Sequence, residues 1–302
     1  MFSIAALYHF SPIQDLVGTR QTLLAACTEH GVKGTLLLAS EGLNGTIASE
    51  GNGVRSVVDA ICALPGFENT SVKWATADAD PFLRLKVRLK REIVTLGVGE
   101  VDTPAHTGTH VPASEWNALI SRPDVIVVDT RNDYEVAIGT FEGAVDPGTK
   151  SFTEFPAWID NAADIDKDTP LAMFCTGGIR CEKATAYLTE QGFTNLFQLD
   201  GGILRYLEEV DEPESMWDGE CYVFDRRVSV GHGLVPGGLE ICPNCNSVIG
   251  DAAREAEGYA VGITCPVCVD TISADRYARF AERQKQVELA EARGTTHLGR
   301  PA

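Results

Sequence analysis

The residues best suited to chemistry lie between Cys175 and Arg180, in the stretch Cys-Thr-Gly-Gly-Ile-Arg. The apolar run Leu171–Phe174 predicts a buried parallel strand that ends at Cys175, and helix-forming residues at 183–188 predict a helix directly after it. Two glycines permit a tight loop with inward-pointing N–H groups, and Arg180 adds positive charge. These features favour a thiolate, so we predict that Cys175 is a nucleophile supported by Arg180. A buried free cysteine is the alternative.

The length of this loop narrows the chemistry. Four residues separate the cysteine from the arginine, one fewer than in cysteine phosphatases, which leaves a tighter cradle suited to one sulfur atom or a small anion. Thr176, Gly177 and Gly178 are expected to support that cradle. The pattern resembles the rhodanese active-site loop C-x-x-G-x-R, and the wider match through Lys183 is closer still to the rhodanese-like tRNA uridine-34 hydroxylases.

This resemblance implies a function. It implies oxygen-dependent 5-hydroxylation of the wobble uridine of tRNA, with tRNA as the partner, O2 as a co-substrate and the loop cysteine, as thiolate or persulfide, as the essential residue. No flavin, haem or other organic-cofactor motif is recognisable in the sequence. A rhodanese-type sulfurtransferase carrying a cysteine persulfide is the alternative enzyme, and a binding module with an inert rhodanese domain is a third interpretation. No oligomeric state follows from the sequence.

The mechanism that we expect begins with addition of the Cys175 sulfur to C6 of the uracil ring. That addition would make C5 electron-rich enough to be oxidised, while Arg180 and the loop N–H groups stabilise the enolate oxygen. The expectation comes from an activated sulfur in a site that has no recognisable cofactor motif.

Length and composition describe a folded, soluble chain. With 302 residues and 44% apolar composition it can bury a substantial core, and the length suggests two or three domains. The N-terminus lacks a basic region, and no apolar stretch approaches the roughly 20 residues that span a bilayer. We therefore expect a cytoplasmic protein without membrane contact. Nine cysteines, including two C-x-x-C pairs, favour thiol chemistry and metal binding over a disulfide framework.

The charge is unevenly distributed. The formal net charge of −18 argues against a nucleic-acid partner, but residues 1–100 contain nine Lys and Arg against ten Asp and Glu, so they carry −1 and the remainder −17. A basic surface is therefore expected only near the N-terminus.

Residues 1–98 alternate strand and helix patterns in the order βαββαβ, which predicts an α/β domain of the ferredoxin-like type. One predicted strand, within 82–96, places four cations on a single face, and we call them the basic stripe: Arg84, Lys86, Arg88 and Lys90. Four cations in a row match the phosphates of RNA better than a small ligand, so the stripe is an RNA-binding candidate. A solvated sheet face, or an edge protected by charge, is the alternative.

Residues 111–210 continue the alternation of strand and helix, which predicts a second α/β domain. The resemblance of its loop implies that this domain is of the rhodanese type. The segment 99–111 before it is expected to be a linker. His106 and His110 within that segment have no evident partner and are interpreted as exposed loop residues.

Polar residues follow a strand of this domain. Asp129 and Arg131 come at its end, and because the carboxyl ends of parallel strands meet at one edge, we expect both to hold the Cys175 loop by hydrogen bonds. A surface ion pair is the alternative. Thr140 stands where rhodaneses usually have a histidine. That histidine is not the nucleophile, so the change affects only a supporting contact. Cys181 is a candidate resolving thiol, or a small buried residue at the helix start.

The C-terminal region, residues 215–302, contains a second cysteine pattern. Two C-x-x-C pairs are 19 residues apart, a spacing typical of four-thiolate zinc ribbons, and they provide Cys242, Cys245, Cys265 and Cys268. A segment with so few large apolar residues needs a staple, which structural Zn²⁺ would supply. Two reduced redox pairs or an iron–sulfur cluster are the alternatives. A charged helix is expected over 274–292.

Overall fold

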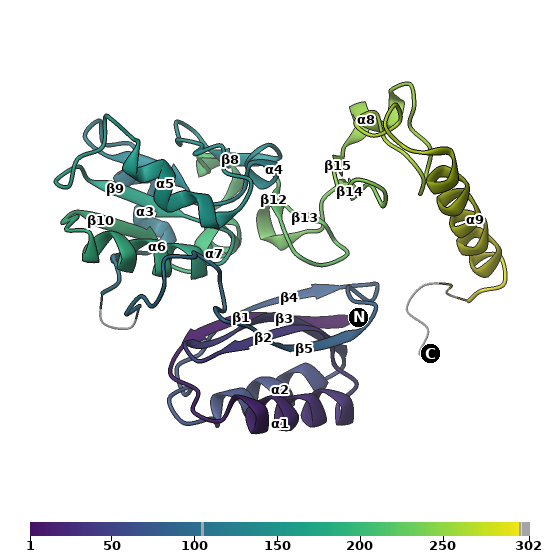
Figure 1. The fold of residues 1–302 in the computed structure, drawn as a ribbon, viewed down its shortest axis with the longest axis horizontal. Coiled ribbons are helices and arrows are strands. Elements are labelled where there is room, and N and C mark those ends of the chain that lie inside the picture. The colour runs from purple at the N-terminus through teal and green to yellow at the C-terminus, as the bar shows by residue number, and fades with distance from the viewer. Residues whose placement is uncertain (104–105, 296, 298–302) are drawn as a thin grey trace.

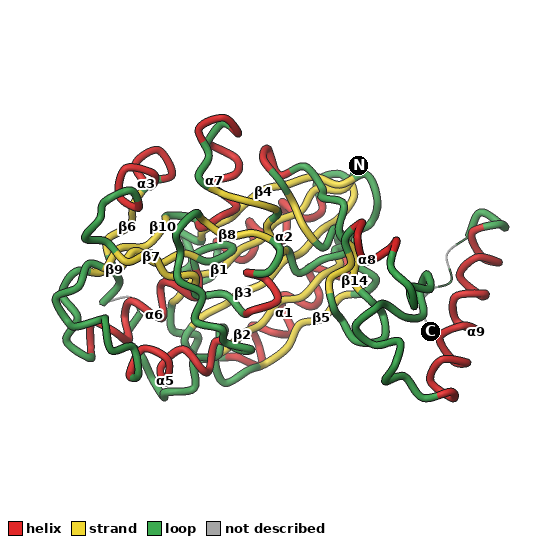
Figure 2. The backbone as a smooth tube through the Cα atoms, turned by 90° about the horizontal axis from the view of Figure 1, so that it is seen from above, coloured by secondary structure: helices red, strands yellow, loops and turns green. Residues whose placement is uncertain are grey.

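The computed structural model describes residues 1–103, 106–295 and 297, and it shows an N-terminal domain, a central domain and a smaller C-terminal segment (Figure 1). Two helices cover one face of the N-terminal sheet, and the opposite face points toward the central domain. Figure 2 shows the C-terminal helix standing away from both sheets. Within the described ranges, no helix combines the length and the apolar character needed to cross a bilayer.

The N-terminal domain is a five-stranded sheet in the order β4-β1-β3-β2-β5. Its elements are β1 (Phe2–Phe10), α1 (Leu16–Glu29), β2 (Lys33–Ala39), β3 (Gly42–Glu50), α2 (Gly53–Cys62), β4 (Ser71–Ala77) and β5 (Leu85–Leu89). Alternate apolar residues of the strands, such as Leu36 and Ile47, point to α1 and α2 and form the core. The first four strands pair antiparallel in the predicted ferredoxin-like order, and β5 adds a parallel edge strand beside β2.

The strand predicted within residues 82–96 is shorter in the structure. After Lys90 the backbone leaves the sheet, because two carboxylates capture its N–H groups: Ile93 donates to Glu41 at 2.6 Å and Leu96 donates to Glu92 at 3.0 Å. The apolar residues at 93–96 therefore continue toward the central domain instead of extending β5.

The central domain is built on a parallel four-stranded sheet in the order β6-β10-β9-β7. Its elements are β6 (Thr109–Val111), α3 (Ala113–Ile120), β7 (Ile126–Asp129), α4 (Asp133–Val136), β8 (Gly139–Phe141), α5 (Phe155–Asp160), β9 (Leu171–Phe174), α6 (Ile179–Glu190), β10 (Leu196–Leu199), α7 (Gly202–Glu209) and β11 (Trp217–Gly219), with 3-10 turns at Phe152–Glu154 and Glu212–Glu214. Every residue of β9 is buried because helices cover both faces of the sheet. Ala172 and Phe174 pack with α3 and α7, whereas Leu171 and Met173 pack with α5 and α6.

The linker expected over 99–111 was wrong at its C-terminal end. Thr109–Val111 pairs with β10 as strand β6, so His110 is not a loop residue. Its Nε2 lies 3.4 Å from Glu182 Oε1 and its Nδ1 lies 3.8 Å from Asp200 Oδ1. The strand escaped prediction because it is only three residues long and two of them are polar. His106 is exposed, as predicted.

The C-terminal segment contains two short hairpins and two helices. They are β12 (Cys221–Tyr222), β13 (Ser229–Val230), β14 (Glu240–Ile241), β15 (Val248–Ile249), α8 (Asp251–Glu255) and α9 (Ala274–Glu291), with a 3-10 turn at His232–Leu234. The helix expected at 274–292 is confirmed as α9, which begins where the Ser273 side chain accepts the Arg276 N–H at 3.3 Å. The fold is the mixed α/β architecture that the sequence predicts.

A buried lysine joins the two large domains. Lys183 of α6 is fully buried, and its ammonium donates to Glu41 Oε2 at 2.8 Å and to Glu92 Oε2 at 2.6 Å. The carbonyl of Val94 accepts a further bond at 3.1 Å. Because a buried charge requires partners, this cluster holds α6, the helix that follows Cys175, against the N-terminal domain.

Candidate active site

The loop from Cys175 to Arg180 connects the carboxyl end of β9 to the start of α6, as predicted. Gly178 has a φ of +104° and donates its N–H to the Cys175 sulfur at 3.1 Å. A side chain at Gly178 would strain the backbone and collide with the Tyr8 hydroxyl. On the other side, Ile203 at the start of α7 donates its N–H to the Cys175 carbonyl at 2.9 Å. The loop is thus wrapped closely around the sulfur.

The electrostatics of the loop favour a thiolate at Cys175. Burial opposes ionisation, but hydrogen bonding from the Cys181 thiol, the positive charge of Arg180 and the N–H groups at the start of α6 lower the pKa of Cys175 to about 6. An unperturbed thiol has a pKa of about 8.5 and is mostly protonated at neutral pH. With a pKa of about 6, Cys175 is mainly ionised there.

Cys181 lies in the first turn of α6 and is fully buried. Burial and the neighbouring Cys175 charge raise the pKa of Cys181 well above its usual value, and its sulfur lies 3.6 Å from the Thr130 hydroxyl. Cys181 therefore stays protonated beside the thiolate. Its function as a resolving thiol stays a prediction.

Arg180 is held by a residue that sequence reasoning missed. Its guanidinium forms a bidentate ion pair with Glu135, at 2.7 Å and 2.8 Å, and both side chains are buried. Glu135 also accepts a bond from the Thr176 hydroxyl at 3.3 Å. Burial by itself would raise the pKa of Glu135, but the Arg180 charge and its hydrogen bonds lower it below the usual value. The arginine therefore contributes positive potential to Cys175 while its own charge is largely matched.

Asp129 and Arg131 support the site one step further away than expected. The two form a fully buried bidentate pair, with Nε–Oδ1 at 2.9 Å and Nη2–Oδ2 at 2.6 Å, so neither a surface pair nor a direct bond to the Cys175 loop is present among the described residues. Arg131 instead donates to the Glu135 carbonyl at 3.2 Å. The Thr140 hydroxyl donates to Asp129 at 3.0 Å, so this threonine still makes a polar contact with the pair.

The Cys175 loop faces a cavity of about 280 Å³ between the three parts of the chain. Strands β1, β3 and β4 of the N-terminal sheet provide one wall, the loop provides the second, and residues 223–227 of the C-terminal segment provide the third. The cavity lining includes Tyr8, Asn44, Lys73, Cys175 and Phe224. Sequence reasoning did not anticipate this enclosure, because it depends on how three distant segments pack.

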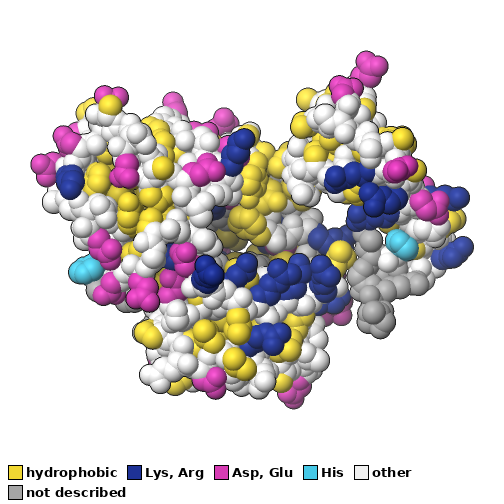
Figure 3. All heavy atoms as spheres, in the orientation of Figure 1, with side chains coloured by type: hydrophobic (Ala, Val, Ile, Leu, Met, Phe, Trp, Pro, Cys, Tyr) yellow, Lys and Arg dark blue, Asp and Glu magenta, His cyan; other side chains and the backbone are white. Residues whose placement is uncertain are grey.

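The basic stripe lies at the far edge of the same sheet. Leu85 and Val87 point to the helices, so the alternating cations occupy the helix-free face or the strand ends. Among the described residues, none of the four side chains forms an ion pair, and none lines the cavity. Figure 3 shows Lys and Arg side chains gathered along this edge, and again on the C-terminal segment across a hollow. The RNA-binding role of the stripe stays a prediction.

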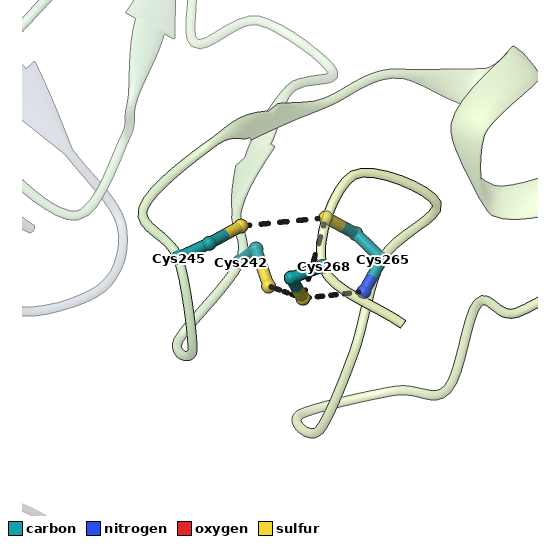
Figure 4. Close-up of side chains that lie close together, drawn as sticks. All are labelled: Cys242, Cys245, Cys265 and Cys268. Carbon is teal, nitrogen blue, oxygen red and sulfur yellow. Dashed lines mark hydrogen bonds between the residues drawn. The ribbon is translucent and has the colours of Figure 1, made fainter. Parts of the chain in front are cut away.

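The four C-terminal cysteines converge as their spacing predicts. Their sulfurs all lie within 4.8 Å of one another, with Cys242–Cys268 at 3.8 Å, Cys245–Cys265 at 3.5 Å and Cys265–Cys268 at 3.9 Å (Figure 4). Four sulfurs placed about 2.3 Å from one ion are separated by roughly 3.8 Å in a tetrahedron, so the cluster can hold a metal ion. Three of the four are buried, and they form the centre of this segment's small core.

Comparisons with known proteins agree with this architecture. Residues 2–93 match the UPF0176 acylphosphatase like domain, and residues 112–209 match the Rhodanese-like domain. A relative from Agrobacterium fabrum named tRNA uridine(34) hydroxylase is 52% identical over 99% of this chain and 95% of its own length. Relatives of the same name from Brucella anthropi and Acaryochloris marina are 50% and 48% identical, over 99% of this chain and 98% and 96% of their own lengths. The chain therefore belongs to the tRNA uridine(34) hydroxylase family.

Proposed function

We propose that this protein hydroxylates C5 of uridine 34 in tRNA, with O2 as the co-substrate and Cys175 as the essential residue. The observation that carries the proposal is the position of the thiolate, in the wall of a partly open cavity of about 280 Å³. This volume is close to the lower end of ordinary ligand pockets, which begin at roughly 300 Å³. It suits a single base better than the one sulfur atom that a sulfurtransferase would carry. Membership of the hydroxylase family supports the same reaction.

The chemistry that we propose starts from the lowered pKa of Cys175. The sulfur, as thiolate or persulfide, adds to C6 of the uracil ring, and the resulting enolate makes C5 the carbon that is oxidised. The Gly178 N–H and the protonated Cys181 thiol hold the sulfur in place before the addition. Arg180, with Thr176 and Gly177, charges and shapes this loop in place of the enolate contact expected from the sequence, because its guanidinium is already paired with Glu135. Asp129 and Arg131 support the loop indirectly, through the Glu135 carbonyl.

The three parts of the chain would then divide the work. We propose that residues 1–98 bind tRNA through the basic stripe, that residues 111–210 provide the thiolate, and that residues 215–302 close the cavity. A buried base requires extrusion from the anticodon loop, which costs least for an unpaired nucleotide. The wobble base is unpaired in free tRNA, and the enzyme would meet it in the cytoplasm.

We propose further that the Cys242, Cys245, Cys265 and Cys268 cluster binds structural Zn²⁺. Four cysteine sulfurs at tetrahedral spacing suit zinc, and with all four positions taken by protein the ion has no open site for catalysis. Its contribution would be to fold residues 240–270, whose small core the cysteines form.

Nucleoside mass spectrometry tests the function. Cells that lack the gene should lose 5-hydroxyuridine at position 34, and the wild-type gene should restore it. Cys175→Ser should restore none, because the nearly isosteric hydroxyl is not ionised at neutral pH. Cys62→Ser, which changes a cysteine of the N-terminal domain outside the cavity, is the matched control. Restoration by Cys175→Ser would contradict the nucleophile, whereas sulfur transfer without 5-hydroxyuridine would instead support the sulfurtransferase.

A further inference from the structure

Three cations line the cavity that contains the Cys175 sulfur: Lys73, Arg180 and Arg227. Two of them are already matched. Arg180 forms its bidentate pair with Glu135, and Arg227 pairs with Asp225 at 2.6 Å. Neither has a full charge left for a substrate.

Lys73 differs from both. It lies on β4 opposite Ala6 of β1, on the helix-free face of the sheet, since its neighbours Val72 and Trp74 pack against the helix side. The residue is only 8% exposed, yet its ammonium makes no hydrogen bond or ion pair with any residue that the structure describes. Its tip lies against Gly201, directly before the glycine that abuts the Cys175 loop.

The Lys73 side chain is mostly buried, but its Nζ is not sealed from solvent and has no ion-pair partner among the described residues. An ammonium in that position can bind an anionic oxygen without first releasing a carboxylate. Burial lowers the pKa of Lys73, and the Arg205 charge lowers it further, against smaller opposing effects of the Asp200, Glu208 and Glu209 carboxylates. Such an ammonium is a stronger hydrogen-bond donor than a solvated lysine and gains most from an anionic oxygen placed beside it.

We propose that Lys73 is a catalytic residue that binds the oxygen on which negative charge develops when Cys175 attacks the uracil ring. The inference rests on the proposed function and adds a residue to it. The sulfur electron pair forms the S–C6 bond, the C5=C6 pair moves to C4–C5, and the C4=O4 pair moves onto O4. The negative charge thus passes from sulfur to O4 without gain or loss of a proton. Lys73 donates a hydrogen bond to O4 across the cavity.

The first test compares Lys73→Met with Lys33→Met, which removes an ammonium from the same domain outside the cavity. Single-turnover hydroxylation of tRNA should fall at least 100-fold in Lys73→Met, while the tRNA dissociation constant stays within threefold. Lys33→Met should keep the wild-type rate. The melting temperature of Lys73→Met should equal or exceed that of the wild type, because no partner is left unpaired. Turnover within fivefold of wild type, or a loss of turnover with a lowered melting temperature, would overturn the assignment.

The second test does not depend on hydroxylation. Iodoacetate and iodoacetamide both alkylate a thiolate, but only iodoacetate carries a negative charge that Lys73 can attract. The ratio of their rate constants at Cys175, read by peptide mass spectrometry, should fall severalfold in Lys73→Met and stay unchanged in Lys33→Met. An unchanged ratio in Lys73→Met would show that the Lys73 ammonium does not attract anions in the cavity, which would overturn the assignment. If the ratio falls in Lys73→Met but the wild-type protein makes no 5-hydroxyuridine, Lys73 is still the cation of the cavity and the proposed function is rejected.

Discussion

At the scale of single residues, the site separates two tasks that one arginine would otherwise perform. Arg180, which also lines the cavity, lowers the pKa of Cys175, and Glu135 fixes its orientation. Lys73 lines the cavity from another domain and forms no direct ion pair with a described residue. Arg180 therefore stabilises the thiolate and Lys73 stabilises the later enolate. Arg180 does not have to leave Glu135 when the negative charge moves to the enolate oxygen.

The lowered pKa of Cys175 predicts a pH dependence. The thiolate is the reactive form and the pKa is about 6, so the rate of iodoacetamide alkylation should rise through about pH 6 and level off near neutrality. Cys181→Ala should move the midpoint to higher pH, because it removes a donor that favours the ionised form. Mass spectrometry of the labelled peptide gives the rate. Cys27, whose pKa burial raises to about 11, should stay unlabelled over this range, and a Cys175 midpoint above about pH 8 would contradict the activation described here.

The residues of the loop could be predicted because their signal is local. Cys175, the glycines and Arg180 lie within six consecutive positions, and loop length and charge alone indicate a thiolate cradle. Glu135 lies 45 positions away from Arg180, and no short motif states that pairing. Lys73 resembles any lysine of a half-buried strand until its strand is packed against the central domain. A polar pair between distant residues, or a charged side chain without a partner, is a property of the tertiary structure.

At the scale of elements, the N-terminal sheet presents two kinds of cation on one face. Strand β4 at one edge carries Lys73 beside the cavity, and strand β5 at the other edge carries the basic stripe. With neighbouring strands about 4.8 Å apart, four steps across the sheet separate them by roughly 19 Å. A tRNA whose phosphates contact the stripe would therefore lie alongside the strands whose side chains line the cavity.

Charge reversal tests the role of β5. Arg84→Glu together with Lys86→Glu should weaken tRNA binding by a few kcal/mol, roughly, and should reduce the dependence of binding on salt, because about one counterion is released for each phosphate contact. Filter binding at several salt concentrations measures both effects. Arg122→Glu, which changes an exposed cation of the central domain, should leave them unchanged. An unchanged salt dependence in the double variant would return the stripe to a solvated sheet face.

Element prediction succeeded where periodicity was long and failed where it was short. Strand β1 and helix α2 have patterns that a buried face imposes over several residues, β9 is a continuous apolar run, and α9 is a long charged stretch with only Ala290 buried. Strand β6 has only three residues, and the apolar residues after β5 belong to a segment that two carboxylates turn out of the sheet. In both cases backbone hydrogen bonds to distant groups, absent from local patterns, decided the structure.

At the scale of the whole molecule, the cavity exists only because three parts meet. The buried Lys183 ties α6 to Glu41 and Glu92, which sets the N-terminal sheet opposite the thiolate. The C-terminal segment adds the third wall, with Phe224 at the cavity and 58% exposed. That wall is anchored in the core of the central domain through Cys221, Val223 and Val230, whereas residues 240–270 have little apolar core apart from their cysteines. The order of residues 240–270 therefore depends on what holds the four sulfurs together.

Removal of the metal should therefore unfold residues 240–270 and leave the rest of the chain folded. If the four cysteines bind one Zn²⁺, binding contributes about 10–16 kcal/mol to folding of the segment, far more than its small core can supply. Chelation should raise hydrogen exchange across residues 240–270 and leave exchange in β9 and α6 unchanged, and Cys242→Ser should do the same without a chelator. Elemental analysis should find one zinc per chain. A chain that contains almost no metal when purified reduced and undamaged, yet protects residues 240–270 from exchange, would show that thiol packing alone folds this segment.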